Sequence, residues 1–404
     1  MKLMIHRGDG VVEYNLVELA TETTRIILDC GRKLPLLDYV SSEETIDIPG
    51  LTSGASTYDA VFITNHHADH ADLAERINSD IPVYMNADTK IILDIVSDFT
   101  DSPLSRANKY LEHGRVEQVG DISVLPISVD YSMSGRMILL IEAEGKKLLY
   151  TGGFKKIDPA YYATIGKIDV LLCEMTNIGD KDDVDINSVE EFAAGIMRHT
   201  DKPVFVLCPV TDADRIKHIE RACRKSGRNM ALDPFMKSIL ERLTTPLIVD
   251  PFGFIPYIDR ERTPRINKHL ISNRDMDFNE VGNFSSVEVV ARMTNLVFMV
   301  RQSMSDFLDR LNELTPLAGS TLINFMWRGY ENTVITKRFL ELCQAFDMKG
   351  TFIHASDYAY RKQLENAISQ LEPEILVPIQ TEGAEIFREM QGNVVEPGVD
   401  EIAI

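Results

Sequence analysis

The residues of this chain best suited to chemistry lie in one cluster, Asn65-His66-His67-Ala68-Asp69-His70, directly after the apolar run at residues 60–64. Imidazole nitrogens and carboxylate oxygens are the ligands that Zn²⁺ takes in proteins, and a loop at a strand end lets several converge. His67, Asp69 and His70 are therefore candidate ligands of a divalent metal, Zn or Mn. Asp69 is also a candidate catalytic residue of a metal-dependent hydrolase. The alternative is a hydrogen-bonded cluster that only keeps the shape of the loop.

The elements that must position this cluster are short strands. Apolar and β-branched runs punctuated by Gly and Asp fill residues 1–175 and predict a β-sandwich faced by helices. The predicted strands are 11–19, 24–28, 60–64, 137–142, 147–151 and 169–173.

Beyond the polar stretch at residues 179–183 the pattern changes to alternating helices and strands. The segment Ser188-Val189-Glu190-Glu191 is a capping box and predicts the start of a helix, and residues 214–226 predict a second amphipathic helix. Further strands are expected at 203–208, 295–300, 320–325 and 375–379, and a further helix over 358–370. This alternation indicates an α/β unit.

Composition sets the outer bounds. The chain has 404 residues, 44% hydrophobic and 26% charged, which predicts a globular protein of two or three domains. No uncharged apolar run approaches the roughly 18–20 residues of a membrane span, so we expect a cytoplasmic protein that does not bind a membrane. The five cysteines form no C-x-x-C pair and are expected to be free thiols. The formal charge of −20 repels polyanions, so a nucleic acid would need a locally basic groove.

The cluster resembles a motif of the metallo-β-lactamase superfamily, a strand followed by T-H-x-H-x-D-H. Four residues match it in register: Thr64, His67, Asp69 and His70. Asn65 stands where the family has its first histidine. Residues 24–31 resemble the family's first motif, in which Asp29 would support the ligand loop from outside the metal shell. The resemblance implies an αββα sandwich and a two-metal hydrolytic centre.

Other ligand positions of the family also carry different residues here. In a segment resembling V-D-H-S, Tyr131 replaces the histidine; in one resembling T-G-D-F-K, Gly153 replaces the bridging aspartate. In one resembling I-P-V-H-G-E, Gln380 replaces the last histidine. Glycine offers no ligand atom, and the amides of Asn65 and Gln380 are weak neutral donors. The resemblance therefore implies a degenerate centre that holds no metal or holds one only weakly.

Later segments resemble the β-CASP branch of the superfamily, which includes ribonuclease J. Residues 169–177 are similar to its acidic motif A, with Glu174 as the acid, a catalytic residue if the protein is active. A segment resembling H-x-S-G-H-A covers residues 354–359, where Tyr358 replaces the motif B histidine.

The same segment carries the candidate phosphate-binding residues, His354 and Ser356. In ribonuclease J-like proteins these positions contribute to a pocket for a nucleotide phosphate. The alternative is a packed strand-end histidine and a serine that caps the following helix. Asp357 places a carboxylate where the family has glycine, and its charge would repel a phosphate.

Two further features have simple structural interpretations. A basic stripe on the helix expected at 214–226 would track a nucleic-acid backbone only if it faced a cleft, and a solvated helix face is the simpler interpretation. The stripe consists of Lys217, Arg221, Arg224 and Arg228. The only tryptophan, Trp327, is expected to anchor a core or an interface rather than stack on a base.

The resemblance spans nearly the whole chain and implies its division. Residues 1–177 would form the first part of the metallo-β-lactamase domain, 178–350 the inserted β-CASP domain, and 351–404 the segment that completes the first domain. Three functions stay open: an impaired protein (a pseudoenzyme) that binds RNA or a nucleotide or pairs with an active relative, an active metal-dependent RNA hydrolase with an atypical ligand set, and an interaction subunit without nucleic acid. The family also implies a homo-oligomer, commonly a dimer.

Overall fold

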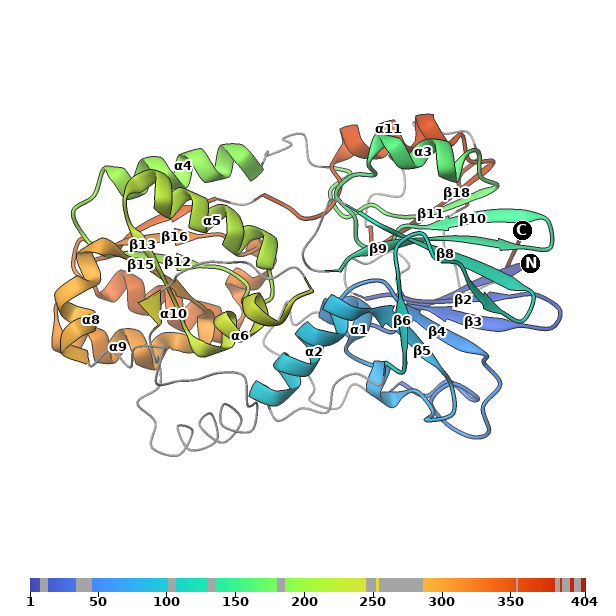
Figure 1. Ribbon diagram of the computed structural model, residues 1–404, viewed down its shortest axis with the longest axis horizontal. Helices are drawn as coiled ribbons and strands as arrows, with labels where there is room; N and C mark the ends of the chain where they lie inside the picture. The colour runs from blue at the N-terminus through green and yellow to red at the C-terminus, as the bar shows by residue number, and fades with distance from the viewer. Residues whose placement is uncertain are drawn as a thin grey trace.

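The computed structural model describes residues 1–7, 14–33, 46–100, 107–129, 135–179, 186–244, 252–253, 286–353, 355–381, 386, 393–395 and 401–404. Within these ranges the chain forms two bodies, a pair of facing sheets and a third sheet with its own helices (Figure 1). Among the helices described, none is long and apolar enough to pass through a membrane.

The first body is a sandwich of two sheets. The seven-stranded sheet has the order β19-β1-β2-β3-β4-β5-β6, with β19 Ile402–Ala403, β1 Lys2–Arg7, β2 Leu16–Ala20, β3 Arg25–Leu28, β4 Ala60–Ile63, β5 Val83–Asn86 and β6 Lys109–Leu111. The six-stranded sheet has the order β18-β11-β10-β9-β8-β7, with β18 Ile375–Ile379, β11 Val170–Glu174, β10 Lys146–Tyr150, β9 Met137–Ala143, β8 Ile122–Ser128 and β7 Glu117–Val119.

Alternating side chains fill three layers of this sandwich. On β4, Phe62 packs between the sheets, whereas Val61 and Ile63 pack on the outer face. That outer face carries α1 Ala68–Ala71 and part of α2 Ala87–Thr100, while α3 Pro159–Ile165 and α11 Arg361–Leu371 cover the other sheet (Figure 1). The expected αββα sandwich is therefore confirmed.

The second body is a parallel sheet with helices on both faces. Its order is β14-β13-β15-β12-β16-β17, with β14 Phe252–Gly253, β13 Asn229–Leu232, β15 Leu296–Val300, β12 Val204–Leu207, β16 Thr321–Asn324 and β17 Lys349–Phe352. One face packs on α4 Ile186–Arg198, α5 Ala213–Ser226 and α6 Pro234–Arg242, and the other on α8 Ser286–Arg292, α9 Ser305–Leu314 and α10 Val334–Ala345.

The strand order reverses around β12. The chain leaves β12 toward β13 on one side and later reaches β16 on the other, so the carboxyl ends of β15, β12 and β16 border a topological switch point. Loops diverge from such a point and leave a crevice, which is where ligands bind in open α/β sheets. Here that edge of the second body faces the first, and α2 packs against α6 across the junction through stacked rings of Phe99 and Phe235, 4.6 Å apart.

Most predicted elements match the observed ones to within a residue or so at each end, with three exceptions. The strand predicted at 11–19 is observed at Leu16–Ala20, and residues 11–13 lie outside the described part of the chain. Helix α4 begins at Ile186, so Ser188 is exposed within the first turn and the capping-box prediction is wrong. Helix α11 begins at Arg361 and not near Tyr358, because Tyr360 is extended and bridges to Asn177. The third sheet lies between residues 204 and 352, and the exact bounds of the predicted domains stay a prediction.

Candidate functional site

The loop from Thr64 to His67, between β4 and α1, is held by the carboxylate of Asp29. That carboxylate accepts hydrogen bonds from Thr64 N at 2.7 Å, from Tyr150 Oη at 2.7 Å and from His70 Nδ1 at 2.7 Å. The neighbouring turn approaches so closely that a Cβ on Gly31 would lie 1.7 Å from the backbone oxygen of Asp69. Asp29 thus lies in the supporting position that the sequence predicts for it.

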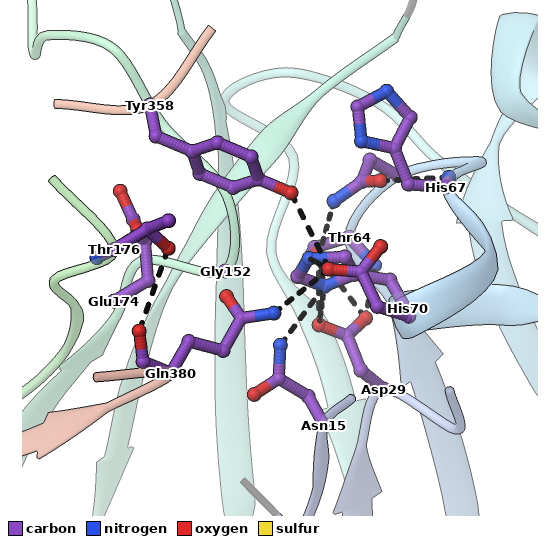
Figure 2. A network of polar contacts seen from close by, with 12 residues as sticks. Asn15, Asp29, Thr64, His67, His70, Gly152, Glu174, Thr176, Tyr358 and Gln380 are labelled. Atoms are coloured by element: carbon purple, nitrogen blue, oxygen red, sulfur yellow. Dashed lines mark hydrogen bonds and ion pairs between the residues drawn. The ribbon is translucent and has the colours of Figure 1, made fainter. Parts of the chain in front are cut away.

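Asp69 is contacted from two segments that lie far along the chain and by the neighbouring His70. Its Oδ2 accepts from Gln380 Nε2 at 2.8 Å and from Tyr358 Oη at 3.3 Å, and it lies 3.4 Å from His70 Nε2. Figure 2 shows Tyr358, from the turn before α11, and Gln380, from the end of β18, pointing toward the group of His70 and Asp29. Tyr358 and Gln380, which stand where the family has histidines, therefore both donate hydrogen bonds to Asp69, the carboxylate that the metal motif retains.

The two carboxyl groups beside His70 determine its charge. Burial alone lowers the pKa of the His70 imidazole, but Asp69 and Asp29 together raise that pKa to about 10. Burial alone raises the pKa of Asp69, yet His70 holds it well below its usual range. At neutral pH an imidazolium therefore lies between two carboxylates.

His67 faces a cation instead of a metal. Its Nε2 accepts from Arg136 Nη2 at 3.3 Å, because a guanidinium can only donate. Burial and then Arg136 lower the pKa of His67 to about 4, so the ring is neutral at pH 7. The lone pair of His67 Nε2 therefore accepts a hydrogen bond from Arg136 and is not available to a metal ion. The positive charge of Arg136 would also repel a metal cation at this position.

The position of Gly153 has no room for a larger side chain. A Cβ there would lie 2.9 Å from Cε1 of Tyr358 and 3.6 Å from both Asn65 Nδ2 and His70 Nε2. Asn65 is turned to its own loop, where its Oδ1 accepts from the backbone of His67 at 2.8 Å. The ring of Tyr358 therefore fills the space in which a carboxylate at position 153 would lie.

These observations test whether a divalent metal fits. Asp69 Oδ2 and His67 Nε2 are each engaged with a protein donor, and Gly153 supplies no ligand. His70 Nδ1 is bonded to Asp29, so this histidine could offer only its Nε2, which is buried without a hydrogen-bond partner. Across the described residues no group of three His, Cys, Asp or Glu is arranged to hold a metal ion. The donor set as it stands does not fit a two-metal centre. Tyr131 lies outside the described residues.

Glu174 supports a neighbouring turn. Its carboxylate accepts from Thr176 N at 3.1 Å and from Ala359 N at 3.4 Å, and burial raises its pKa to about 7.

The hydroxyl of Ser356, one of the two candidate phosphate-binding residues, accepts from Asn177 Nδ2 at 2.8 Å and from Tyr358 N at 3.2 Å, as a turn cap does. The other candidate phosphate-binding residue, His354, lies outside the described residues.

Two arginines that sequence reasoning did not single out as functional converge on Asp357. Arg136, just before β9, donates to Asp357 Oδ2 at 3.2 Å and to its backbone oxygen at 3.1 Å. Arg215, on α5, lies 3.4 Å from Asp357 Oδ1 and donates to Ala355 O at 3.0 Å and Asp212 Oδ2 at 2.6 Å. The carboxylate at the family's glycine position thus joins arginines of both bodies.

A cavity of about 470 Å³ opens between the two bodies. One wall is formed by the residues that follow β12, β15 and β16, and the other by the loop at 66–69, the turn at 356–358 and Gln380. Apolar side chains dominate the first wall, including Phe325 and a half-buried Trp327 that packs edge-to-face on Tyr330 at 5.6 Å. The cavity thus extends from the Asp69 cluster to the switch point of the third sheet.

The basic stripe is divided between solvent and packing: Arg221 and Arg224 are exposed on α5, whereas Arg228, just after the helix, is buried. Arg228 donates to the backbone oxygens of Met197 and Lys202 at 2.9 Å each, at the end of α4. Arg221 lies 3.9 Å from a carboxylate oxygen of Glu190. Neither arginine lines the cavity.

Known proteins match the chain as follows. The family model described as beta-lactamase superfamily domain matches residues 24–206. Ribonuclease J of Sinorhizobium meliloti is 24% identical over 399 residues, which covers 89% of this chain and 64% of that protein. The chain thus spans less than two thirds of the length of this relative. A protein of unknown function from Enterococcus faecalis V583 has a crystal structure with a TM-score of 0.77 and 18% identity, covering 100% and 99% of the two chains, which shows the shared fold.

Residues 24–206, less than half of the chain, therefore match a domain of the metallo-β-lactamase superfamily. Over most of its length the chain is similar to ribonuclease J.

Proposed function

We propose that this chain is a catalytically impaired ribonuclease J-like protein that binds a nucleotide or RNA phosphate in the cavity between its two bodies. The observation that carries the proposal is the convergence of Tyr358 Oη and Gln380 Nε2 on the same oxygen of Asp69. Metal-dependent hydrolysis needs that oxygen for an ion and a bridging group beside it. Both requirements conflict with the packing of this cluster.

The substitutions support the proposal because they are mutually compatible. Gly153 makes room for the Tyr358 ring, and the amide of Gln380 supplies a donor where a metal cation would be. A damaged site would leave buried carboxylates without partners, at a cost of several kcal/mol. Here Asp69 and Asp29 are both paired, so the cluster supports a stable metal-free role.

Phosphate binding is supported by the position and chemistry of the cavity. It borders the carboxyl ends of three parallel strands, where ligands of α/β sheets bind. Arg215 lines it, and guanidinium groups suit phosphate oxygens. The similarity to a protein named ribonuclease J supports RNA or a part of it as the ligand.

Elemental analysis and a cleavage assay test the proposal. Protein purified with added Zn²⁺ or Mn²⁺ should hold substoichiometric metal and leave a 5′-monophosphorylated RNA uncut, while binding it saturably. A variant with Asn65→His, Gly153→Asp, Tyr358→His and Gln380→His, with Tyr131→His added from the sequence alone, restores the family ligands and is the positive control for metal uptake. Multiple-turnover cleavage by the native chain, lost in Asp69→Ala, would refute the proposal.

Pairing with an active relative, homo-oligomerisation and a cytoplasmic location stay predictions. Light scattering of the purified chain measures the oligomeric state.

A further inference from the structure

Two buried cations from different bodies share one partly exposed anion. The side chains of Arg136 and Arg215 are 9% and 4% exposed, whereas that of Asp357 is 34% exposed. Asp357 places one carboxylate oxygen near each guanidinium, at 3.2 and 3.4 Å. The carboxylate therefore bridges the arginines from the solvent side, and it lines the cavity together with Arg215.

The two guanidinium groups retain unused hydrogen-bonding capacity. Arg136 Nε and Arg215 Nη1 are buried and have no hydrogen-bond partner. Burial of a donor without a partner costs free energy, and two guanidinium groups around one carboxylate offer more donors than its two oxygens can take at good geometry. An anion with three acceptor oxygens would satisfy this pair better than a carboxylate does.

The charge count leads to the same conclusion. Arg215 is paired with Asp212 at 2.6 Å, so that carboxylate accounts for one of the two positive charges. Asp357 thus supplies the second negative charge that balances the two arginines. Without it the pair would carry one uncompensated positive charge at the edge of the cavity.

We propose that Arg136 and Arg215 form an anion site for a phosphate group and that Asp357 is its built-in competitor, so that an external phosphate binds by displacing this carboxylate. The inference rests on the proposed function and names the residues that would recognise the phosphate. In this proposal the two arginines recognise the phosphate. Ser356 has a structural role instead, because its hydroxyl already accepts two hydrogen bonds.

The test measures binding of inorganic phosphate and of uridine monophosphate by calorimetry. Asp357→Asn keeps the shape of the side chain and removes its charge, and should tighten phosphate binding about tenfold or more, because one competing charge within 4 Å is removed. Adding Arg215→Met to that variant should abolish the gain. Asp72→Asn is the matched control, because Asp72 lines the same cavity and contacts neither arginine; it should leave the affinity as it is in the native chain.

Three results would overturn the proposal: no tightening in Asp357→Asn, an equal tightening in Asp72→Asn, or a gain that survives Arg215→Met. If Asp357→Asn does not fold, hydrogen–deuterium exchange of the native chain decides. Millimolar phosphate should then raise exchange at residues 356–358 as the carboxylate leaves, and unchanged exchange at every phosphate concentration would contradict displacement.

The test of the anion site can fail or succeed independently of the test of the proposed function. Tighter phosphate binding by Asp357→Asn together with no binding of monophosphorylated RNA by any variant would keep the anion site and reject the RNA ligand. Cleavage by the native chain would reject impaired catalysis and leave the anion site standing.

Discussion

The buried carboxyl of Glu174 should make stability depend on pH between about 4.5 and 7. Burial raises its pKa to about 7 from an ordinary value of 4.5. A group whose pKa is higher in the folded state contributes stability that is fully present below the unfolded pKa and is lost as pH rises through the folded one. A shift of about 2.5 units at about 1.4 kcal/mol per unit gives a loss of about 3 kcal/mol by pH 8.

Glu174→Gln removes the titratable group, and the neutral amide of the glutamine resembles a protonated carboxyl in shape. The variant should lose less stability than the native chain between pH 5 and pH 8, by about 2.5 kcal/mol, because part of the loss has already occurred by pH 5. Urea unfolding at half-unit pH steps, followed by circular dichroism, measures the difference. Glu341→Gln, at an exposed position of α10, is the control and should follow the native curve. Parallel curves for the native chain and Glu174→Gln would show that the burial of this carboxyl does not shift its titration as we infer.

Three further predictions concern the Asp69 cluster. Gly153→Ala should lower stability by about 1–3 kcal/mol, because its Cβ would lie 2.9 Å from the Tyr358 ring, and Tyr358→Ala should remove most of that added cost; thermal melts of the single and double variants check this coupling. Gln380→Leu should cost about 1–3 kcal/mol, since it takes a buried donor from Asp69, and a melt unchanged from the native one would contradict the hydrogen bond. EDTA should leave the melting temperature of the native chain unchanged, and a drop that added Zn²⁺ reverses would point to a bound structural metal.

The sequence was sufficient to predict the sandwich and the position of the Asp69 loop, because both depend on local patterns. Apolar runs with strand periodicity set the sheets, and a His/Asp cluster directly after Ile63 could lie only at the end of that strand. The start of α4 was predicted wrongly because serine is a common N-cap residue and Glu191 follows Ser188 at the capping-box spacing, whereas the helix already includes Ile186.

The contacts that decide function were not predictable in the same way. The fit of Tyr358 against Gly153 joins residues distant in the chain, and each substitution alone suggests only a lost ligand. Likewise, Arg136 and Arg215 belong to different bodies, and no local spacing connects either to Asp357. Tertiary packing determines such contacts, so they can be identified only from the three-dimensional structure.

The imidazolium of His70 has a consequence for the conditions in which the protein can exist. A fold that takes its central cation from solution has a stability linked to the concentration of that ion. Here the cation is part of the polypeptide and stays charged across the physiological range, because Asp69 and Asp29 raise its pKa to about 10. Newly made chains should therefore mature equally well in metal-starved and metal-replete cells.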